Sequence, residues 1–177
     1  MGQIHRFEPE KMIVGVIFSE EEKLKAALAM LEEHFGPVDH VSETFCFSDD
    51  FSTYYDKELG GKGMRRIYSF RDPVDASRQA GIKTLTNEIE QSLSVGGARH
   101  VNLDPGFINR GRLMLATTKD ASFRIPLGDG IYTELTLFYA RGAWQKLPWT
   151  YRDYQSERVQ KFLTEVREIY LEQRKRG

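Results

Sequence analysis

The hydrophobic positions near the start of the chain predict a buried strand followed by an amphipathic helix. Residues 12–18 form a continuous apolar run rich in branched side chains, which is typical of a central strand covered on both faces. In the next segment, apolar side chains recur at helical spacing: Leu24, Ala27, Leu28, Leu31 and Phe35. Ser19 and Glu22 predict a capping box at the start of this helix, and Gly36-Pro37 predicts its end.

The pattern continues with two strands, a second helix and a short strand. Residues 38–47 alternate as a strand does and residues 65–70 form another, with the polar, glycine-rich segment 48–63 between them. Asp72-Pro73 predicts the start of the next helix. The apolar side chains of that helix are Ile82, Leu85, Ile89 and Leu93. A short strand is expected at residues 100–103.

The order strand, helix, strand, strand, helix, strand predicts an α+β fold with a ferredoxin-like (split βαβ) core of about residues 12–103. Asp104-Pro105 then begins either a helix or a strand, and residues 107–116 fit both. The elements expected after that are a hairpin of residues 123–127 and 131–139, a strand at 143–146 and a terminal helix at 156–173. We expect residues 1–177 to form a single domain, with the core extended by the C-terminal β-hairpin and the terminal helix.

Composition narrows the class of protein. The chain is 40% hydrophobic and 29% charged with a net charge of -1, which favours a folded protein without a general attraction to nucleic acid or anionic membranes. The single cysteine, Cys46, excludes an internal disulfide and a cysteine-rich zinc site. No apolar run is long enough to cross a bilayer and the first residues lack a signal-peptide core, so we expect a cytoplasmic location.

Several polar clusters lie directly beside predicted strands, where a charge must be paired, solvated or used. Asn102 and Asp104 follow a strand, although an aspartate before proline is also a common turn or cap residue. Thr118, Lys119 and Asp120 offer a hydroxyl, a cation and a carboxylate, or form a simple polar turn. Arg124 and Glu134 lie on the two strands of the hairpin, either as a cross-strand pair on a wet face or as the lining of a pocket.

The leading hypothesis is a site for a phosphorylated or nucleotide-like small molecule. Its ligand-binding residues would be Asn102, Asp104, Thr118, Lys119, Asp120, Arg124 and Glu134, with Tyr54, Tyr55 and Lys57 from the 48–63 loop. The two cations would neutralise anionic groups. The carboxylates of Asp104 and Glu134 would bind hydroxyls or Mg²⁺, with no dedicated protein metal site. If the protein is an enzyme, these two are the best catalytic candidates, as proton acceptors whose pKa is raised by burial.

The alternative is a non-catalytic protein-interaction or homo-oligomerisation domain, in which the polar clusters are caps and surface pairs. Trp144, Trp149 and the hairpin would then form the association face. RNA binding through an aromatic sheet is a third hypothesis, but the central strands lack the basic-aromatic pattern of such domains.

Seven strings of the sequence carry a resemblance to a known family. They are FGPVD (35–39), TYYDKELG (53–60), IKTLTNEIE (82–90), VNLDPG (101–106), LATTKD (115–120), GIYTELTLFY (130–139) and LPWTYRDY (147–154). Over nearly all of its length the chain resembles a family of small bacterial proteins that share a domain of unknown function, some of which carry the label GTP-binding protein. Thr118-Lys119-Asp120 bears on that label, but it lacks one residue of the Thr-Lys-x-Asp motif of GTPases.

Overall fold

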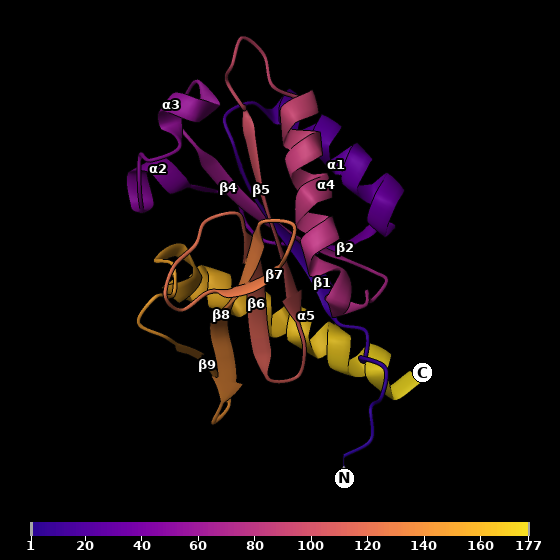
Figure 1. Ribbon diagram of the computed structural model, residues 1–177. Coiled ribbons are helices and arrows are strands. Elements are labelled where there is room, and N and C mark those ends of the chain that lie inside the picture. The colour runs from indigo at the N-terminus through magenta and orange to yellow at the C-terminus, as the bar shows by residue number, and fades with distance from the viewer. Residues whose placement is uncertain (1, 177) are drawn as a thin grey trace.

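The computed structural model describes residues 2–176, which form a mixed α+β fold around one open, antiparallel sheet of nine strands (Figure 1). The strands are β1 (Lys11–Phe18), β2 (Val38–Val41), β3 (Phe45–Cys46), β4 (Met64–Phe70), β5 (Val101–Ile108), β6 (Arg112–Thr117), β7 (Ile125–Gly128), β8 (Ile131–Ala140) and β9 (Ala143–Lys146). The α-helices are α1 (Glu21–Phe35), α2 (Phe47–Asp50), α3 (Asp56–Leu59), α4 (Gln79–Ser92) and α5 (Glu157–Arg176), and the short 3-10 helices are η1 (Ala76–Arg78) and η2 (Asp153–Gln155).

The order across the sheet is β2-β4-β1-β5-β6-β8-β7, with β3 paired to β4 and β9 paired to β8. Figure 1 shows α1 and α4 next to each other on one side of the sheet and α5 crossing the other side. Every residue of β1 is buried because both of its faces are covered. The core under α1 and α4 includes Met12, Val14, Val16, Leu31, Phe70 and Leu103, and the core under α5 includes Ile13, Ile67, Leu113, Leu137, Phe162 and Val166.

The hydrophobic pattern predicted β1 and α1 correctly, but the caps at the helix starts were wrong. Gly36 ends α1 as expected, with φ 79° and its N–H bonded to the Glu32 carbonyl oxygen. The Ser19 hydroxyl does not cap α1; it donates to the Leu59 carbonyl oxygen at 2.6 Å and so ties the end of β1 to α3. Asp72-Pro73 does not start a helix either, because η1 comes first and Asp75 caps it through the N–H of Ser77.

The single strand expected at residues 38–47 is two short strands. β2 pairs with the end of β4 and β3 with its beginning, so the chain between them leaves the sheet. The segment that follows, expected to be a loop, contains α2 and α3. Its apolar side chains explain this, because Phe47 and Leu59 are buried against Ile17 of β1.

Asp104-Pro105 begins no new element, because both residues lie inside β5. This strand pairs with β1 along its whole length, from Lys11 opposite Ile108 to Phe18 opposite Val101. A tight turn then leads into β6, so residues 107–116 are two strands and not a helix. The hairpin of β7 and β8, the strand β9 and the terminal helix α5 lie where the sequence predicted them, within a few residues.

A cationic cavity in the fork between β5 and β6

β5 and β6 separate after a short paired stretch. Their pairing ends with Gly106 opposite Leu115. Beyond this point β5 stays paired with β1, while β6 stays paired with β8. Pro105 marks the separation, because it has no N–H to donate to a neighbouring strand. The two strands therefore form a fork in an otherwise continuous sheet.

Side chains of α4 take the place of the missing strand neighbour in the fork. The N–H of Leu103 donates to Oε1 of Glu90 at 2.6 Å, and Nζ of Lys83 donates to the Leu103 carbonyl oxygen at 2.7 Å. Buried backbone groups need such partners. This explains why α4 turns two charged side chains towards the sheet, where Lys83 is 6% exposed and Glu90 is 3% exposed.

A cavity of about 620 Å³ occupies the fork, and we call it the fork cavity. It is bounded by β5, β6, α4, the segment that carries α2 and α3, and the chain just before α5. Its basic side chains are Arg65, Lys83, Arg99, Lys119, Arg124 and Arg152, and its acidic side chains are Glu58, Asp104 and Asp153. Its aromatic side chains are Phe47, Phe51, Tyr54, Tyr55, Tyr151 and Tyr154. Basic groups thus outnumber acidic groups two to one.

Arg65 of β4 forms the floor of the fork cavity and is 2% exposed. Its guanidinium lies 3.1 Å from Asp104 and 3.3 Å from Asp153, and it donates to the Tyr154 hydroxyl at 3.1 Å. To reach β5 it crosses β1 at Gly15, where a Cβ would lie 2.5 Å from Nη2 of Arg65. Burial alone would raise the pKa of Asp104, but Arg65 and Lys83 outweigh burial and lower it. Asp104 is therefore a poor proton acceptor, contrary to the expectation from sequence.

Arg124 organises the side of the fork cavity next to β8. Its Nε donates to Glu134 at 2.8 Å, Nη1 to the Lys119 carbonyl oxygen at 2.8 Å and Nη2 to the Tyr151 hydroxyl at 2.7 Å. The pair with Glu134 is not on a wet face, because Glu134 is 1% exposed. Burial raises the pKa of Glu134 although Arg124 opposes it. Burial and the nearby Glu134 also raise the pKa of Tyr151 to about 12, so its hydroxyl stays neutral.

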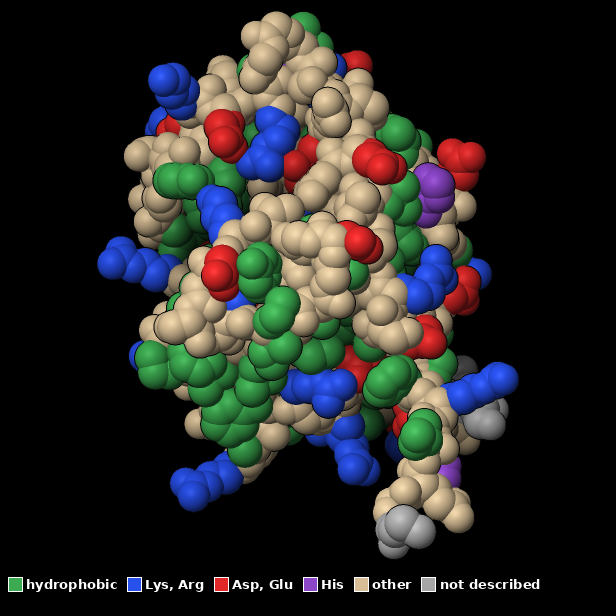
Figure 2. Space-filling model, in the orientation of Figure 1, with side chains coloured by type: hydrophobic (Ala, Val, Ile, Leu, Met, Phe, Trp, Pro, Cys, Tyr) green, Lys and Arg blue, Asp and Glu red, His purple; other side chains and the backbone are tan. Residues whose placement is uncertain are grey.

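Arg99 closes the opposite side of the fork cavity. Its guanidinium joins Glu58 of α3 at 2.7 Å to Glu90 of α4 at 2.8 Å. Figure 2 shows basic and acidic side chains against each other between these two helices. Burial raises the pKa of Glu90, and Lys83 and Arg99 only partly offset this.

Three buried N–H donors of the fork cavity make no hydrogen bond of normal geometry. They are Nε of Arg65, Nε of Arg99 and Nδ2 of Asn102. A buried donor without an acceptor costs about 1–3 kcal/mol. All three groups are donors, so the chemistry that would satisfy them is a molecule rich in acceptor oxygens or nitrogens.

Comparison with family models identifies the chain as a member of a known domain family. The model of the domain of unknown function DUF4416 matches residues 8–170. The chain belongs to this family. The matched range contains every residue that lines the fork cavity. The searches of curated proteins and of solved structures gave no match.

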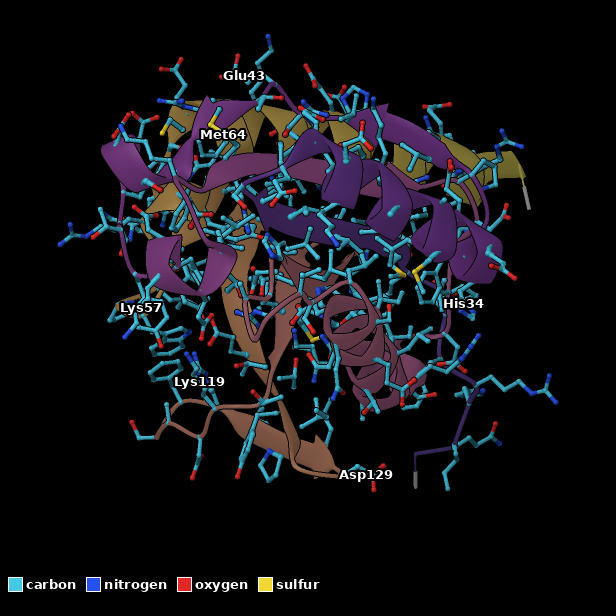
Figure 3. All side chains as sticks on the ribbon, turned by 90° about the horizontal axis from the view of Figure 1, so that it is seen from above. His34, Glu43, Lys57, Met64, Lys119 and Asp129 are labelled. Carbon is cyan, nitrogen blue, oxygen red and sulfur yellow. The ribbon has the colours of Figure 1, made fainter. Side chains whose placement is uncertain are left out.

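This DUF4416 member brings together most of the residues that the sequence analysis selected. Those that line the fork cavity are Tyr54, Tyr55, Asn102, Asp104, Thr118, Lys119 and Arg124. Glu134 lies behind Arg124, and Asp120 and Lys57 are exposed and do not line the cavity. Figure 3 shows Lys57 and Lys119 at the same end of the molecule, on α3 and on the chain after β6.

The sequence analysis missed Arg65, Lys83, Arg99 and Asp153. Arg65 is the first residue of the strand predicted at 65–70 and is followed by Arg66, so the sequence does not distinguish it from an exposed residue at a strand end. Lys83 and Glu90 lie seven positions apart and so share one side of a helix, next to its apolar positions. Their burial depends on the open edge of β5, a tertiary feature that has no local signature.

The fork offers little to a metal ion. Among residues 2–176 no group of three or more His, Cys, Asp or Glu side chains could hold one. Asp104 and Asp153 converge, but the Arg65 guanidinium lies between them and supplies the positive charge. Asp104 and Glu134, which the sequence offers as ligands for hydroxyls or Mg²⁺, are each bound to an arginine. No helix within the described residues combines the length and the apolar character needed to span a membrane.

Proposed function

We propose that this protein binds a small phosphorylated or nucleotide-like molecule in the fork cavity. The observation that carries the proposal is the set of three buried, unpartnered N–H donors of Arg65, Arg99 and Asn102 around one cavity. A ligand with acceptor atoms would remove the cost of leaving these donors unpaired.

The charge and the size of the fork cavity support the same proposal. Six basic and three acidic side chains line the cavity, and Glu90 and Glu134 bind Arg99 and Arg124 from behind, so the balance of charge is slightly positive and favours an anion over a cation. A volume of about 620 Å³ lies within the range of small-molecule sites, which is roughly 300–1,000 Å³. The aromatic rings of Phe51, Tyr54 and Tyr55 add surfaces on which a flat group can stack.

The test is a thermal-stability panel of nucleotides, sugar phosphates and divalent cations on the purified protein. A ligand at about a hundred times its Kd should add about 2.7 kcal/mol to the free energy of unfolding. Lys119→Ala should lose most of this response, because Lys119 is an exposed cation of the cavity wall. Lys57→Ala is the matched control: it removes the same charge from a nearby surface position outside the cavity and should respond as the wild type does. No response to any anion, or an unchanged response in Lys119→Ala, would contradict the proposal.

The fold type expected from the sequence is part of the proposal. We place the core of about residues 12–103 in the ferredoxin-like class, with the C-terminal β-hairpin and the terminal helix as an extension. The strand order β2-β4-β1-β5 and the position of α1 and α4 on one side of the sheet support this assignment.

One observation favours homo-oligomerisation as a second candidate function. Four large hydrophobic side chains of β7 and β8 are at least one-third exposed: Ile125, Leu127, Leu135 and Phe138. Figure 2 shows hydrophobic side chains gathered over the part of this face that carries β7, β8 and β9. Trp144, expected in such a face, is buried under α5. Sedimentation velocity over a range of concentrations, compared with Ile125→Glu, would detect self-association through this surface.

A further inference from the structure

The fork cavity has two chemically different parts. The inner part contains Arg65, Lys83 and Arg99, but Asp104, Asp153, Glu58 and Glu90 bind or face these cations. The inner part is therefore polar without an excess of positive charge. It is also the part that contains the three unpartnered N–H donors.

The outer part, next to β6 and β8, carries the positive charge. Lys119 is exposed there, Arg152 is an exposed cation of the same cavity wall, and neither makes an ion pair among the described residues, since the Glu134 carboxylate binds Arg124. Thr117 and Thr118 add two hydroxyl donors beside Lys119. An anionic group gains most from this outer part, because its cations are not matched by nearby carboxylates.

The inner part fits a group that accepts hydrogen bonds and also donates one. Nδ2 of Asn102, a residue that is 4% exposed, lies against Asp104, whose pKa it helps to lower, but makes no hydrogen bond of normal geometry and so can donate to a ligand. The Asp104 carboxylate is 28% exposed, lines the cavity and can accept a hydrogen bond. A ring with a carbonyl next to an N–H, as in uracil, hypoxanthine or guanine, presents an acceptor and a donor side by side. Adenine and cytosine present an amino group in place of that carbonyl, which the unpartnered donors would oppose.

Aromatic side chains line the cavity as well. Tyr54 and Tyr55 are in edge contact with ring centroids 5.0 Å apart, and Tyr54 accepts a hydrogen bond from Lys119. Tyr151 is held by Arg124. Stacking of a base on such rings stabilises the complex and does not depend on which base is bound.

From this arrangement we infer that the fork cavity binds a nucleotide with a carbonyl-bearing base in its inner part and its phosphate on Lys119 and Arg152 in its outer part. The inference rests on the proposed function and adds the class of base and the direction of binding. The base would pair with Asn102 and Asp104 and stack on the tyrosines.

The experiment compares inosine 5′-monophosphate with adenosine 5′-monophosphate by calorimetric titration of the wild-type protein. These two probes differ only in the edge of the purine that the inner part would contact. Uridine and cytidine 5′-monophosphates form a second matched pair. We expect the carbonyl-bearing member of at least one pair to bind at least about tenfold more tightly, because its partner leaves a buried polar group unpaired.

Two variants test the direction of binding. Lys119→Ala should weaken inosine 5′-monophosphate and ribose 5-phosphate about tenfold while leaving inosine, which has no phosphate, unchanged. Asn102→Ala should weaken inosine and inosine 5′-monophosphate but not ribose 5-phosphate. Lys57→Ala is again the control, and circular dichroism checks that each variant is folded.

The outcomes separate this inference from the proposed function. Equal affinity within both nucleotide pairs would overturn the choice of base, and loss of inosine binding in Lys119→Ala would overturn the direction. If ribose 5-phosphate or sulfate binds but no nucleotide binds more tightly, the inference fails and the proposed function stands. If no anion binds, both fail.

Discussion

The two ends of the β5–β6 pair use the same strands and show opposite polar chemistry. At the turn, Oδ1 of Asn109 accepts from the N–H groups of Gly111 and Arg112, at 2.9 and 3.0 Å. At the fork the strands separate, and the edge of β5 is completed by Lys83 and Glu90 of α4. The backbone of the turn is satisfied by its own Asn109 side chain, whereas the open backbone edge at the fork takes its partners from α4.

Each end of the β5–β6 pair has a hollow. The polar atoms of the larger hollow favour no single kind of ligand. A groove of about 1110 Å³ lies at the turn end, between the N-terminal segment, the turn and the second half of α5; we call it the basal groove. Its charges pair with one another, as in Arg112 with Glu10 and Arg174 with Glu8. Its unpartnered buried atoms are a mixed set of donors and an acceptor, namely Nε2 of Gln79, Nε of Arg112 and Oε2 of Glu10. Such a mixed set suits bridging water. The comparison shows that the pattern of unmet hydrogen bonds distinguishes the two hollows better than their volume does.

The largest expected effect comes from Gly15, on which the floor of the fork cavity depends. Gly15→Ala would place a Cβ within 3 Å of the Arg65 guanidinium, which two carboxylates hold in a fully buried position. We expect the free energy of unfolding to fall by about 3 kcal/mol, measured by urea denaturation.

Gly81→Ala is the control for that substitution. It introduces the same methyl group inside α4, where nothing lies within 4 Å, and should stabilise the protein by up to about 1 kcal/mol. If Gly15→Ala is as stable as the wild type, the Arg65 side chain can move to make room for the methyl group. The floor of the fork cavity is then less rigid than its contacts indicate.

A second prediction is that a substitution in the basal groove lowers the stability of the protein without changing anion binding in the fork cavity. Glu10→Ala removes the acceptor for Nδ2 of Asn109 and Nη2 of Arg112 in the basal groove. The free energy of unfolding should fall by about 1–3 kcal/mol because those donors lose a buried partner. Sulfate binding in the fork cavity should not change.

Glu8→Ala and Lys119→Ala complete this comparison. Glu8 pairs with Arg174 on the surface, where water screens the two charges, so its loss should leave the free energy of unfolding nearly unchanged. Lys119→Ala should show the converse of Glu10→Ala, with unchanged stability and weakened sulfate binding. A loss of sulfate binding in Glu10→Ala would mean that the two ends are coupled.

The sequence predicted those elements whose hydrophobic pattern is complete within one segment. β1, α1, β4 and α5 are of this kind, because each shows its buried side in its own spacing. Asp104-Pro105 misled the prediction because proline usually interrupts a strand. Here the missing N–H lies on the side of β5 that faces the fork. No strand pairs with β5 on that side, so no hydrogen bond of the sheet is lost.

The candidate site was predictable in part for the same reason. Asn102, Lys119 and Arg124 were selected because polar residues interrupt or follow apolar runs, and all three line the fork cavity. Lys83 was not selected, because a lysine in a helix with an apolar stripe is normally solvent-exposed. Its burial follows from the open edge of β5, which requires knowledge of where β6 goes.

A third prediction concerns pH and the outer part of the fork cavity. Burial raises the pKa of Glu134 above the ordinary glutamate value of 4.5, so it takes up a proton as the pH falls from neutrality towards that value. Loss of this negative charge should strengthen sulfate binding as the pH falls, because sulfate itself keeps its charge. The raised pKa in the folded state also means that this group adds stability as the pH falls and withdraws it as the pH rises.

Glu134→Gln isolates the contribution of that carboxyl. The variant keeps every histidine, so any remaining pH dependence belongs to other groups. Isothermal titration with sulfate at pH 5, 6 and 7 should give a flatter profile for the variant than for the wild type. Identical profiles would exclude Glu134 as the group that responds.

The smallest expected effect concerns the hydrogen bond that holds α3 in place at the wall of the fork cavity. Ser19 bonds to the Leu59 carbonyl oxygen and not to the start of α1, so Ser19→Ala should cost about 1 kcal/mol without fraying that helix. Hydrogen exchange should speed up at α3, which carries Glu58 on the cavity wall. Asp75→Ala removes a side chain that does cap a helix, and this loss should appear as faster exchange at the start of α4. Faster exchange in α1 after Ser19→Ala would instead support the prediction from sequence that Ser19 caps this helix. It would contradict the conclusion that Ser19 links α3 to the end of β1.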